Sequence, residues 1–456
     1  MIVLDGSKGE GGGQIIRNAI VYAILLKKSL QIHSIRAKRS QPGLKAQHVK
    51  GLELAVQICG GTLMGATIGS TVLEYHPGNA SDEKQNKIIC DIETAGSICL
   101  LLQVALPCWI FTQRKQLLQY LELRGGTNAD LAPQIDYLQQ ILLPTLSRHC
   151  FPLSTDEENN DNTTTTTSTI LSMTIERRGY YPIGKGIVHC ELNIGGMNHD
   201  DNCIEQEKKN KNAMVVVKDD NFLHPIILKE RGDILSIHIQ SFYAGTVPEW
   251  VAQKMSDAAY QHLLRHTTNT TLPRPTIRII KHENAIGNAC GIFIVAKTST
   301  TCLFGASSLQ KQQPQKKRRN NTHNKRETPA MVGQRAAQEL LDNLVMNDTS
   351  TVDMWLQDQL ILFMALAHGT STIHTNCLTR HTQTAIDVAT IMTGAKFQIT
   401  KKKIVPDSRK RKIPDDKTST HDYGKEDCID GGHIITCIGI GLPLNRDEHE
   451  IQRIET

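Results

Sequence analysis

A glycine-rich segment near the start of the chain carries the first residues that could do chemistry. Residues 5–17 read DGSKGEGGGQIIR, and one acid, Glu10, stands among the glycines before a predicted apolar helix. Glycines let the backbone N–H groups approach a phosphate closely, and the start of the helix adds a partial positive charge. Glu10 is better suited to hold a divalent metal beside a phosphate than to contact the phosphate itself. A structural turn explains the segment equally well, and without Gly-Lys-Ser/Thr it is not a Walker A loop.

A second chemically competent segment lies far downstream. His381 opens HTQTAI (381–386), and a neutral imidazole is a nucleophile near pH 7 that can attack phosphorus. Before it, VDMWLQDQLILFMALA (352–367) places Asp358 and Gln359 at the head of an apolar helix. A polar helix start and helix capping explain the same residues, because the chain contains 18 histidines.

Three arginines could bind phosphates. Arg17 ends the glycine-rich segment, and Arg36 and Arg39 are spaced R-x-x-R in SIRAKRSQPG (34–43). This spacing brings two guanidinium groups together on a loop after a predicted strand, and arginine forks suit phosphate oxygens. A solvated basic edge is the alternative explanation.

The composition predicts a globular protein of two or three domains. The chain has 456 residues, of which 39% are hydrophobic and 21% charged, and its net charge of +5 permits an anionic partner without requiring one. Its 12 cysteines contain no C-x-x-C pair. We therefore expect free thiols in a reducing compartment, with no disulfide partner and no zinc site.

No membrane segment is expected. The N-terminal residues MIVLDGSKGE have neither the charges nor the apolar length of a signal peptide. The most apolar stretch, Ala95–Phe111, is short for a membrane span and is interrupted by Gln103 and Pro107. We expect it to form a buried helix.

A recurring pattern predicts an α/β fold that positions these residues. An amphipathic helix, a turn and a strand recur in 47–65, 133–150 and 381–400. The fold class is α/β (α+β), with a large domain of repeated βα units whose helices pack on sheets. That domain would comprise residues 1–191 and 348–456, the latter part carrying His381. A smaller inserted α/β domain would comprise 192–347.

Four polar stretches resemble surface insertions that are too polar to bury a core. They are 155–169, 197–212, 310–327 and 401–430. The last two contain KKRR (316–319) and RKRK (409–412), which fit nuclear import, nonspecific RNA attraction or simply solvated charge. We expect a nuclear (nucleoplasmic) protein, with the cytoplasm as a second location.

The two chemical segments, taken together, resemble the eukaryotic type of RNA 3′-terminal phosphate cyclase. The resemblance extends in collinear order over most of the chain. Its further blocks are 34–55, 94–108, 124–138, 177–186, 228–234 and 298–309.

The resemblance implies a role for individual residues. The histidine equivalent to His381 takes AMP from ATP as a covalent adduct, and Glu10 would hold a divalent metal, Mg or Mn. The arginines Arg17, Arg36 and Arg39 would bind nucleotide or RNA-end phosphates. The residues that match nucleotide contacts are Gln14, Gln103, Pro133, Trp355, Asp358 and Gln359. From the residues alone, Gln103 is a buried helix amide and Pro133 starts a helix.

The chain departs from the family pattern at four positions. Trp355 stands where tyrosine is usual, so an indole could stack on adenine without the phenol hydroxyl. Met354 replaces a usual glutamate, and Lys185 a usual glycine. Arg380 replaces a usual leucine beside His381, where a cation could keep the imidazole neutral or could occupy the ligand pocket.

The implied partners are ATP and an RNA with a 3′-terminal phosphate, which is converted to a 2′,3′-cyclic phosphate through histidine-AMP and RNA(3′)pp(5′)A. Two alternatives remain open. A non-catalytic, cyclase-like nucleolar protein of ribosomal RNA processing would lack the adenylated histidine. An enolpyruvyl transferase, with distantly similar α/β repeats, would form no covalent nucleotide.

Overall fold

The computed structural model describes most of the chain. The described residues are 1–79, 86–112, 118–129, 131–151, 170–192, 194–195, 215–216, 221–267, 272–310, 327–344, 349–402, 428–429 and 432–444. They form several sheets with helices packed on them, so the predicted α/β class is confirmed. The predicted insertions lie outside the described residues, except for Gln310, Glu327, Lys401, Lys402, Cys428 and Ile429.

The N-terminal sheet carries the glycine-rich segment on its first strand. Its strands, in spatial order, are β1 (Ile2–Asp5), β2 (Leu30–His33), β4 (Leu73–His76) and β3 (Thr62–Met64). Its helices are α1 (Gln14–Leu25) and α2 (Ala46–Cys59). Helix α1 contacts α2, α3 and α9, which explains why it is apolar on nearly every side.

The second sheet packs against a buried helix. Its strands, in spatial order, are β13 (Ala285–Ile286), β7 (Leu171–Gly179), β8 (Gly186–Leu192), β6 (Tyr120–Gly125) and β5 (Lys87–Asp91). Its helical segments are α3 (Ile98–Thr112), α4 (Ile135–Tyr137), η1 (Leu138–Leu142) and α5 (Leu143–Cys150). Helix α3 is the buried helix predicted for the apolar stretch. Among the described residues, no helix has the length and apolar character needed to cross a membrane.

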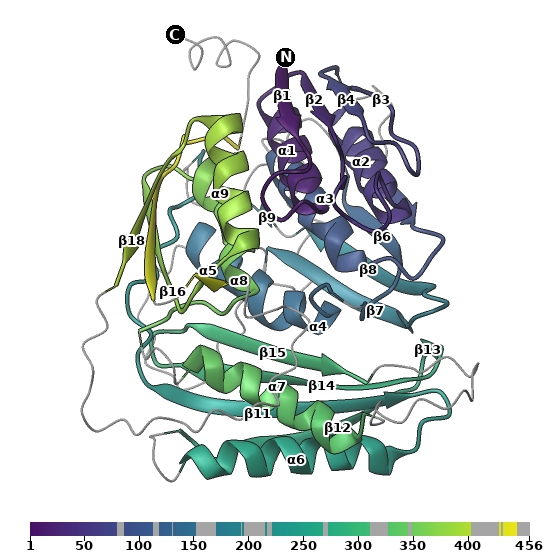
Figure 1. The fold of residues 1–456 in the computed structure, drawn as a ribbon, viewed down its shortest axis with the longest axis vertical. Helices are drawn as coiled ribbons and strands as arrows, with labels where there is room; N and C mark the ends of the chain where they lie inside the picture. The colour runs from purple at the N-terminus through teal and green to yellow at the C-terminus, as the bar shows by residue number, and fades with distance from the viewer. Residues whose placement is uncertain are drawn as a thin grey trace, which may run out of the picture.

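The C-terminal sheet brings the second chemical segment next to the first. Its antiparallel strands are β16 (Thr370–Thr375), β20 (His433–Ile438) and β18 (Lys396–Lys401). Its helices are α8 (Leu356–Leu366) and α9 (Arg380–Thr393). Helix α9 packs against both α1 and α8, so the two ends of the sequence meet in one body, with α9 beside α1 in Figure 1.

A fourth sheet lies in the range predicted to form the smaller domain and occupies the lower part of Figure 1; we name it the smaller sheet. Its strands are β12 (Thr276–His282), β11 (Ile234–Ala244), β14 (Ala289–Thr298) and β15 (Leu303–Leu309). Helices α6 (Glu249–Thr267) and α7 (Pro329–Leu344) pack on it and on each other. The division into domains at residues 192 and 347 stays a prediction. Phe222 and Ile227, inside that range, bridge to Pro443 and Thr372 beside the C-terminal sheet.

Two short strand pairs complete the described elements. They are β9 (Ile194–Gly195) with β10 (Val215–Val216), and β17 (Leu378–Thr379) with β19 (Cys428–Ile429). Cys377, just before β17, is disulfide-bonded, so the expectation that every cysteine is a free thiol is wrong there. A disulfide depends on which residues the fold brings together, and the spacing of the cysteines does not reveal that. The described free thiols are Cys59, Cys90, Cys99, Cys108, Cys150, Cys190, Cys290, Cys302 and Cys437.

Candidate active site

The glycine-rich segment connects β1 to α1 and closes around Glu10. The backbone N–H of Glu10 donates to Oγ1 of Thr384 on α9 at 3.0 Å. One carboxylate oxygen of Glu10 accepts the N–H of Gln14 at 3.0 Å, and the other lies 2.9 Å from Nη2 of Arg39. A carboxylate at the first N–H of a helix is stabilised by the helix dipole. Glu10 therefore fixes the start of α1 against both α9 and the loop of Arg39.

A row of hydrogen bonds connects three predicted site residues on three helices. Nε2 of Gln14 donates to Oδ2 of Asp358 at 2.7 Å, which fixes the orientation of the Gln14 amide. Its oxygen therefore faces Nδ1 of His381 at 2.7 Å and must accept a proton from it. In the neutral ring, the hydrogen is on Nδ1 and the lone pair is on Nε2. The structure thus brings Gln14, Asp358 and His381 together in a tautomer suited to nucleophilic attack.

The acid at the end of this row is partly buried, with Arg17 close by. Burial raises the pKa of Asp358, whereas His381, Arg17 and the bond from Gln14 act in the lowering direction. Arg17 donates from Nε to Oε1 of Gln103 on α3 at 3.1 Å. The predicted residues Arg17 and Gln103 therefore lie in contact, with Arg17 close enough to influence Asp358.

A cavity borders this hydrogen-bonded row. Its apolar lining consists of Leu102, Leu106, Pro107, Leu138, Leu142, Leu143, Leu171, Leu362 and Phe363. Its polar lining consists of Gln14, Asn18, Gln103, Asp358 and Gln359. Apolar walls with a few convergent polar groups are typical of small-molecule sites. Four of the predicted nucleotide contacts therefore line one cavity.

Two polar atoms in the cavity lining lack a hydrogen-bond partner within the described part of the chain. Nε2 of Gln359 donates to the carbonyl of Trp355 at 2.7 Å, which leaves its Oε1 buried without a donor. Nδ2 of Asn18, one turn after Gln14 on α1, is a buried donor without an acceptor. Buried polar atoms of this kind cost free energy unless a ligand or water satisfies them. The pair suits a ligand that presents both a donor and an acceptor.

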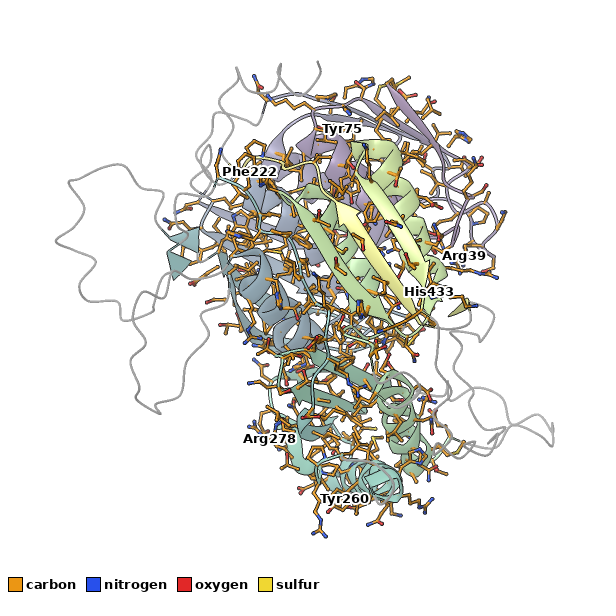
Figure 2. All side chains as sticks on the ribbon, turned by 90° about the vertical axis from the view of Figure 1, so that its left-hand side faces the viewer. Arg39, Tyr75, Phe222, Tyr260, Arg278 and His433 are labelled. Carbon is orange, nitrogen blue, oxygen red and sulfur yellow. The ribbon has the colours of Figure 1, made fainter. Side chains whose placement is uncertain are left out.

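The two loop arginines have different environments. Arg36 is only 7% exposed, and its Nη1 donates to the carbonyls of Gln41 and Gly43 at 2.8 and 2.9 Å. Burial lowers the pKa of Arg36, and Arg39 adds to that effect. The side chain of Arg39 is 48% exposed and reaches Glu10 at the surface seen in Figure 2. Arg36 thus holds its own loop, whereas Arg39 faces the glycine-rich segment.

His48 is a residue near this site that the sequence did not single out. Its Nδ1 accepts the backbone N–H of Lys45 at 3.0 Å, so a neutral ring carries its hydrogen on Nε2. Burial, followed by Arg17, Arg36 and Lys45, lowers the pKa of His48 to about 3. A Cβ at Gly13 would lie 2.4 Å from Nε2 of His48, so only glycine fits there. His48 is a neutral donor at the N-terminus of α1.

Helical spacing could have identified one further residue, but not the others. Asn18 follows Gln14 by one turn and therefore shares its face of α1. His48 and Thr384 meet the glycine-rich segment only through tertiary contacts, and although Thr384 falls within HTQTAI (381–386), nothing in that motif points to Glu10.

Glu10 alone makes an incomplete metal site. No group of three or more His, Cys, Asp or Glu residues that could hold a metal occurs in the described ranges. Both oxygens of Glu10 already accept hydrogen bonds, one from the Arg39 guanidinium. A divalent ion there would need its other ligands from phosphate oxygens and water. The carboxylate fits such a shared site and does not fit a metal site made of protein ligands alone.

Two predicted nucleotide contacts stand apart from the cavity lining. The indole nitrogen of Trp355 donates to Oε1 of Glu339 on α7 at 2.8 Å. Pro133 is buried just before α4. Neither belongs to the described cavity lining, so their nucleotide contacts stay predictions. Among the departures, Arg380 and Lys185 are exposed and Met354 is half-buried, and the described lining contains none of the three.

Comparison with known proteins covers the whole of this site. Residues 8–399 match the family described as RNA 3′-terminal phosphate cyclase. The chain is 33% identical over 399 residues to "Probable RNA 3′-terminal phosphate cyclase" of Dictyostelium discoideum, covering 87% of this chain and 78% of that protein. It is 33% identical over 401 residues to "RNA 3′-terminal phosphate cyclase" of Drosophila melanogaster, covering 88% and 92%. Identity to the protein of that name from Methanococcoides burtonii is 31% over 405 residues, covering 88% and 97%.

Proposed function

The chain belongs to the RNA 3′-terminal phosphate cyclase family, and we propose that it converts an RNA 3′-terminal phosphate to a 2′,3′-cyclic phosphate at the expense of ATP. The observation that carries this proposal is the row of hydrogen bonds from Asp358 through Gln14 to His381, in which Asp358 and Gln14 line the cavity. It leaves a lone pair on Nε2 of a neutral imidazole, as nucleophilic catalysis requires.

The first step forms a histidine–AMP bond. Nε2 of His381 attacks the α-phosphorus of ATP, the new N–P bond forms, and the bond to pyrophosphate breaks. The imidazole gains positive charge in this step. The oxygen of Gln14 accepts the Nδ1–H bond throughout, and the carboxylate of Asp358 orients Gln14 and offsets that charge.

The second and third steps use the RNA end itself. An oxygen of the RNA 3′-phosphate attacks the phosphorus of the adduct, the N–P bond breaks, and RNA(3′)pp(5′)A forms with neutral His381. The adjacent 2′-OH then loses its proton and attacks the RNA phosphorus, which closes the 2′,3′-cyclic phosphate and expels AMP. The ribose holds this nucleophile near its target, so the step is intramolecular.

The remaining predicted residues bind the reactants. Gln103 and Gln359 line the cavity that would receive the nucleotide, and Pro133 and Trp355 belong to the same proposed set. The phosphates would meet the N–H groups at the start of α1 together with Arg17, Arg36 and Arg39. A divalent metal, Mg²⁺ or Mn²⁺, would offset phosphate charge, and Glu10 is the residue that would hold it.

Incubation with α-labelled ATP and a divalent metal tests the proposal. We expect a label that survives denaturation, is lost in acid and is stable in alkali, as for a phosphoramidate. The variant His381→Ala should take up none, and labelling at the wild-type level would refute the assignment. An unlabelled wild-type protein would favour the binding-protein or enolpyruvyl-transferase alternative.

The basic runs KKRR (316–319) and RKRK (409–412), both outside the described residues, motivate a nuclear location. Imaging of a tagged protein with either run replaced by Gly/Ser should show reduced nuclear accumulation. Unchanged accumulation after both replacements would remove this proposal.

A further inference from the structure

A buried acid of the smaller sheet's helices reaches the start of α8. Glu339 lies on α7, is 5% exposed, and accepts the indole N–H of Trp355 at 2.8 Å. Trp355 is the residue immediately before α8, the helix that carries Asp358 and Gln359. This contact connects the smaller sheet and its helices to the catalytic body.

The backbone around Trp355 is fixed by a second buried acid. Asp353 is fully buried, and its Oδ1 accepts the backbone N–H groups of Trp355 and Leu356 at 2.9 and 2.8 Å. It also accepts the hydroxyl of Tyr137 at 2.6 Å and the N–H of Gly305 at 2.7 Å. Asp353 therefore holds Trp355 through its backbone N–H, and Glu339 holds the same residue through its indole.

Trp355 transmits this constraint to the cavity. Its carbonyl accepts Nε2 of Gln359 at 2.7 Å, and that bond leaves Oε1 of Gln359 without a partner at the cavity lining. A displacement of Trp355 as a whole would move that carbonyl, and the Gln359 amide would then lose its fixed orientation. Glu339 and the cavity are thus joined by two consecutive hydrogen bonds through one residue.

We propose that Glu339 is a positioning residue for the nucleotide site, because it fixes Trp355 and thereby the carbonyl that orients Gln359 toward the ligand. The inference rests on the proposed function for the identity of the ligand. The smaller sheet would then contribute to the site, because its helix α7 supplies the contact to Trp355 that positions Gln359 in the cavity lining.

The environment of Glu339 is consistent with this task. Burial raises the pKa of Glu339 to about 8, Trp355 acts against that shift, and Asp353 adds to it. A neutral acid at pH 7 accepts the indole N–H without placing a second charge beside Asp353. An acceptor is required there, because a buried indole N–H without one is costly.

Four variants of the full-length protein test the proposal. Glu339→Gln keeps an acceptor for the indole, Glu339→Ala removes it, and Trp355→Phe removes the donor. Asn343→Ala is the matched control, because Asn343 is buried on the same helix and its side chain donates only within α7, to the carbonyl of Glu339. For each variant, the KM for ATP and the maximal rate of AMP labelling are measured, and a non-hydrolysable ATP analogue is titrated by calorimetry.

Positioning predicts a specific pattern across the variants. We expect Glu339→Ala and Trp355→Phe each to raise KM for ATP and Kd for the analogue about tenfold, with a smaller change in maximal rate. The double variant should be no worse than either single one. Glu339→Gln should restore both constants to within about threefold, and Asn343→Ala should only lower the melting temperature. The tryptophan emission lost in Trp355→Phe should shift to longer wavelength in Glu339→Ala.

Other outcomes would overturn the proposal. Unchanged KM and Kd in folded Glu339→Ala would reduce Glu339 to a structural role, as would additive effects in the double variant. The proposed function can fail separately. If the wild-type protein binds the analogue but takes no label, the chemistry is wrong while the calorimetry still decides the role of Glu339. If it binds no analogue, both fail.

Discussion

Two carboxylates on either side of the start of α8 have opposite surroundings. Asp353 is fully buried and accepts hydrogen bonds from Tyr137, Gly305, Trp355 and Leu356. Asp358 lines the cavity and accepts Nε2 of Gln14, with cationic residues close by. The first carboxylate joins the smaller sheet to the large body, and the second orients a residue that contacts the proposed nucleophile.

The difference teaches how to separate structural from functional acids when both are buried. A carboxylate whose oxygens are saturated by backbone N–H groups cannot act on a ligand without breaking the fold. A carboxylate at a cavity, connected to a reactive group through one amide, can change its interactions during a reaction. Residue type and position on the helix do not distinguish the two, but their hydrogen-bond partners do.

The prediction with the strongest effect tests the structural role of Asp353. Asp353→Ala removes the acceptor of several buried donors, and we expect a loss of about 4 kcal/mol in the free energy of unfolding. Urea unfolding measures it, and Asp353→Asn should lose less because it keeps one oxygen. Asp358→Ala is the comparison variant and should lose under about 1 kcal/mol. Equal losses for the two acids would contradict the distinction.

A second prediction tests the functional role of the row of hydrogen bonds from Asp358 to His381. Gln14→Leu removes both the acceptor of Nδ1 of His381 and the donor to Asp358, so the imidazole loses its fixed tautomer. We expect the maximal rate of AMP labelling to fall about hundredfold, or ~2.7 kcal/mol, with stability changed by less than about 1 kcal/mol. Asp358→Asn keeps an oxygen for Gln14 and should lose about tenfold. A wild-type labelling rate in Gln14→Leu would exclude the row of hydrogen bonds from catalysis.

The comparison also shows what the sequence could predict. The apolar stretch Ala95–Phe111 forms the predicted buried helix, α3, because its pattern is local. Gln14, Asp358 and His381 were predicted through motifs, and the structure brings them together. Glu339, Asp353 and His48 act through partners far away in sequence, such as Tyr137 for Asp353. No periodicity in the chain specifies such pairs, so only the folded structure reveals them.

A third prediction uses the pH dependence of stability to test the buried acid Glu339. Burial raises the pKa of Glu339 from 4.5 to about 8, so the folded protein binds a proton that the unfolded chain has released. The contribution of Glu339 to stability should therefore fall as pH rises, by about 2 kcal/mol between pH 6 and pH 8. The titratable groups that face it are Asp353, Asp342 and Tyr137.

Glu339→Gln isolates this effect, because it cannot ionise. We expect the difference in free energy of unfolding between the wild-type protein and this variant to change by about 2 kcal/mol between pH 6 and pH 8, because the other titratable groups, including His48, act equally in both. Denaturant unfolding at a series of pH values measures both curves. Parallel curves would mean that Glu339 is ionised in the folded protein.

A fourth prediction, with a small effect on stability, concerns the two loop arginines Arg36 and Arg39. Arg36 is buried and donates to backbone carbonyls, whereas Arg39 is half-exposed beside Glu10. An exposed ion pair contributes little to stability, so Arg39→Ala should change the free energy of unfolding by less than about 1 kcal/mol. Arg36→Ala should cost more, because it leaves loop carbonyls without a donor.

If Arg39 binds an RNA-end phosphate, Arg39→Ala should slow cyclisation of a 3′-phosphorylated RNA about tenfold while the protein stays folded. Chemical unfolding and single-turnover cyclisation measure the two effects, and Arg39→Ala with full cyclisation activity would place the phosphate contact elsewhere.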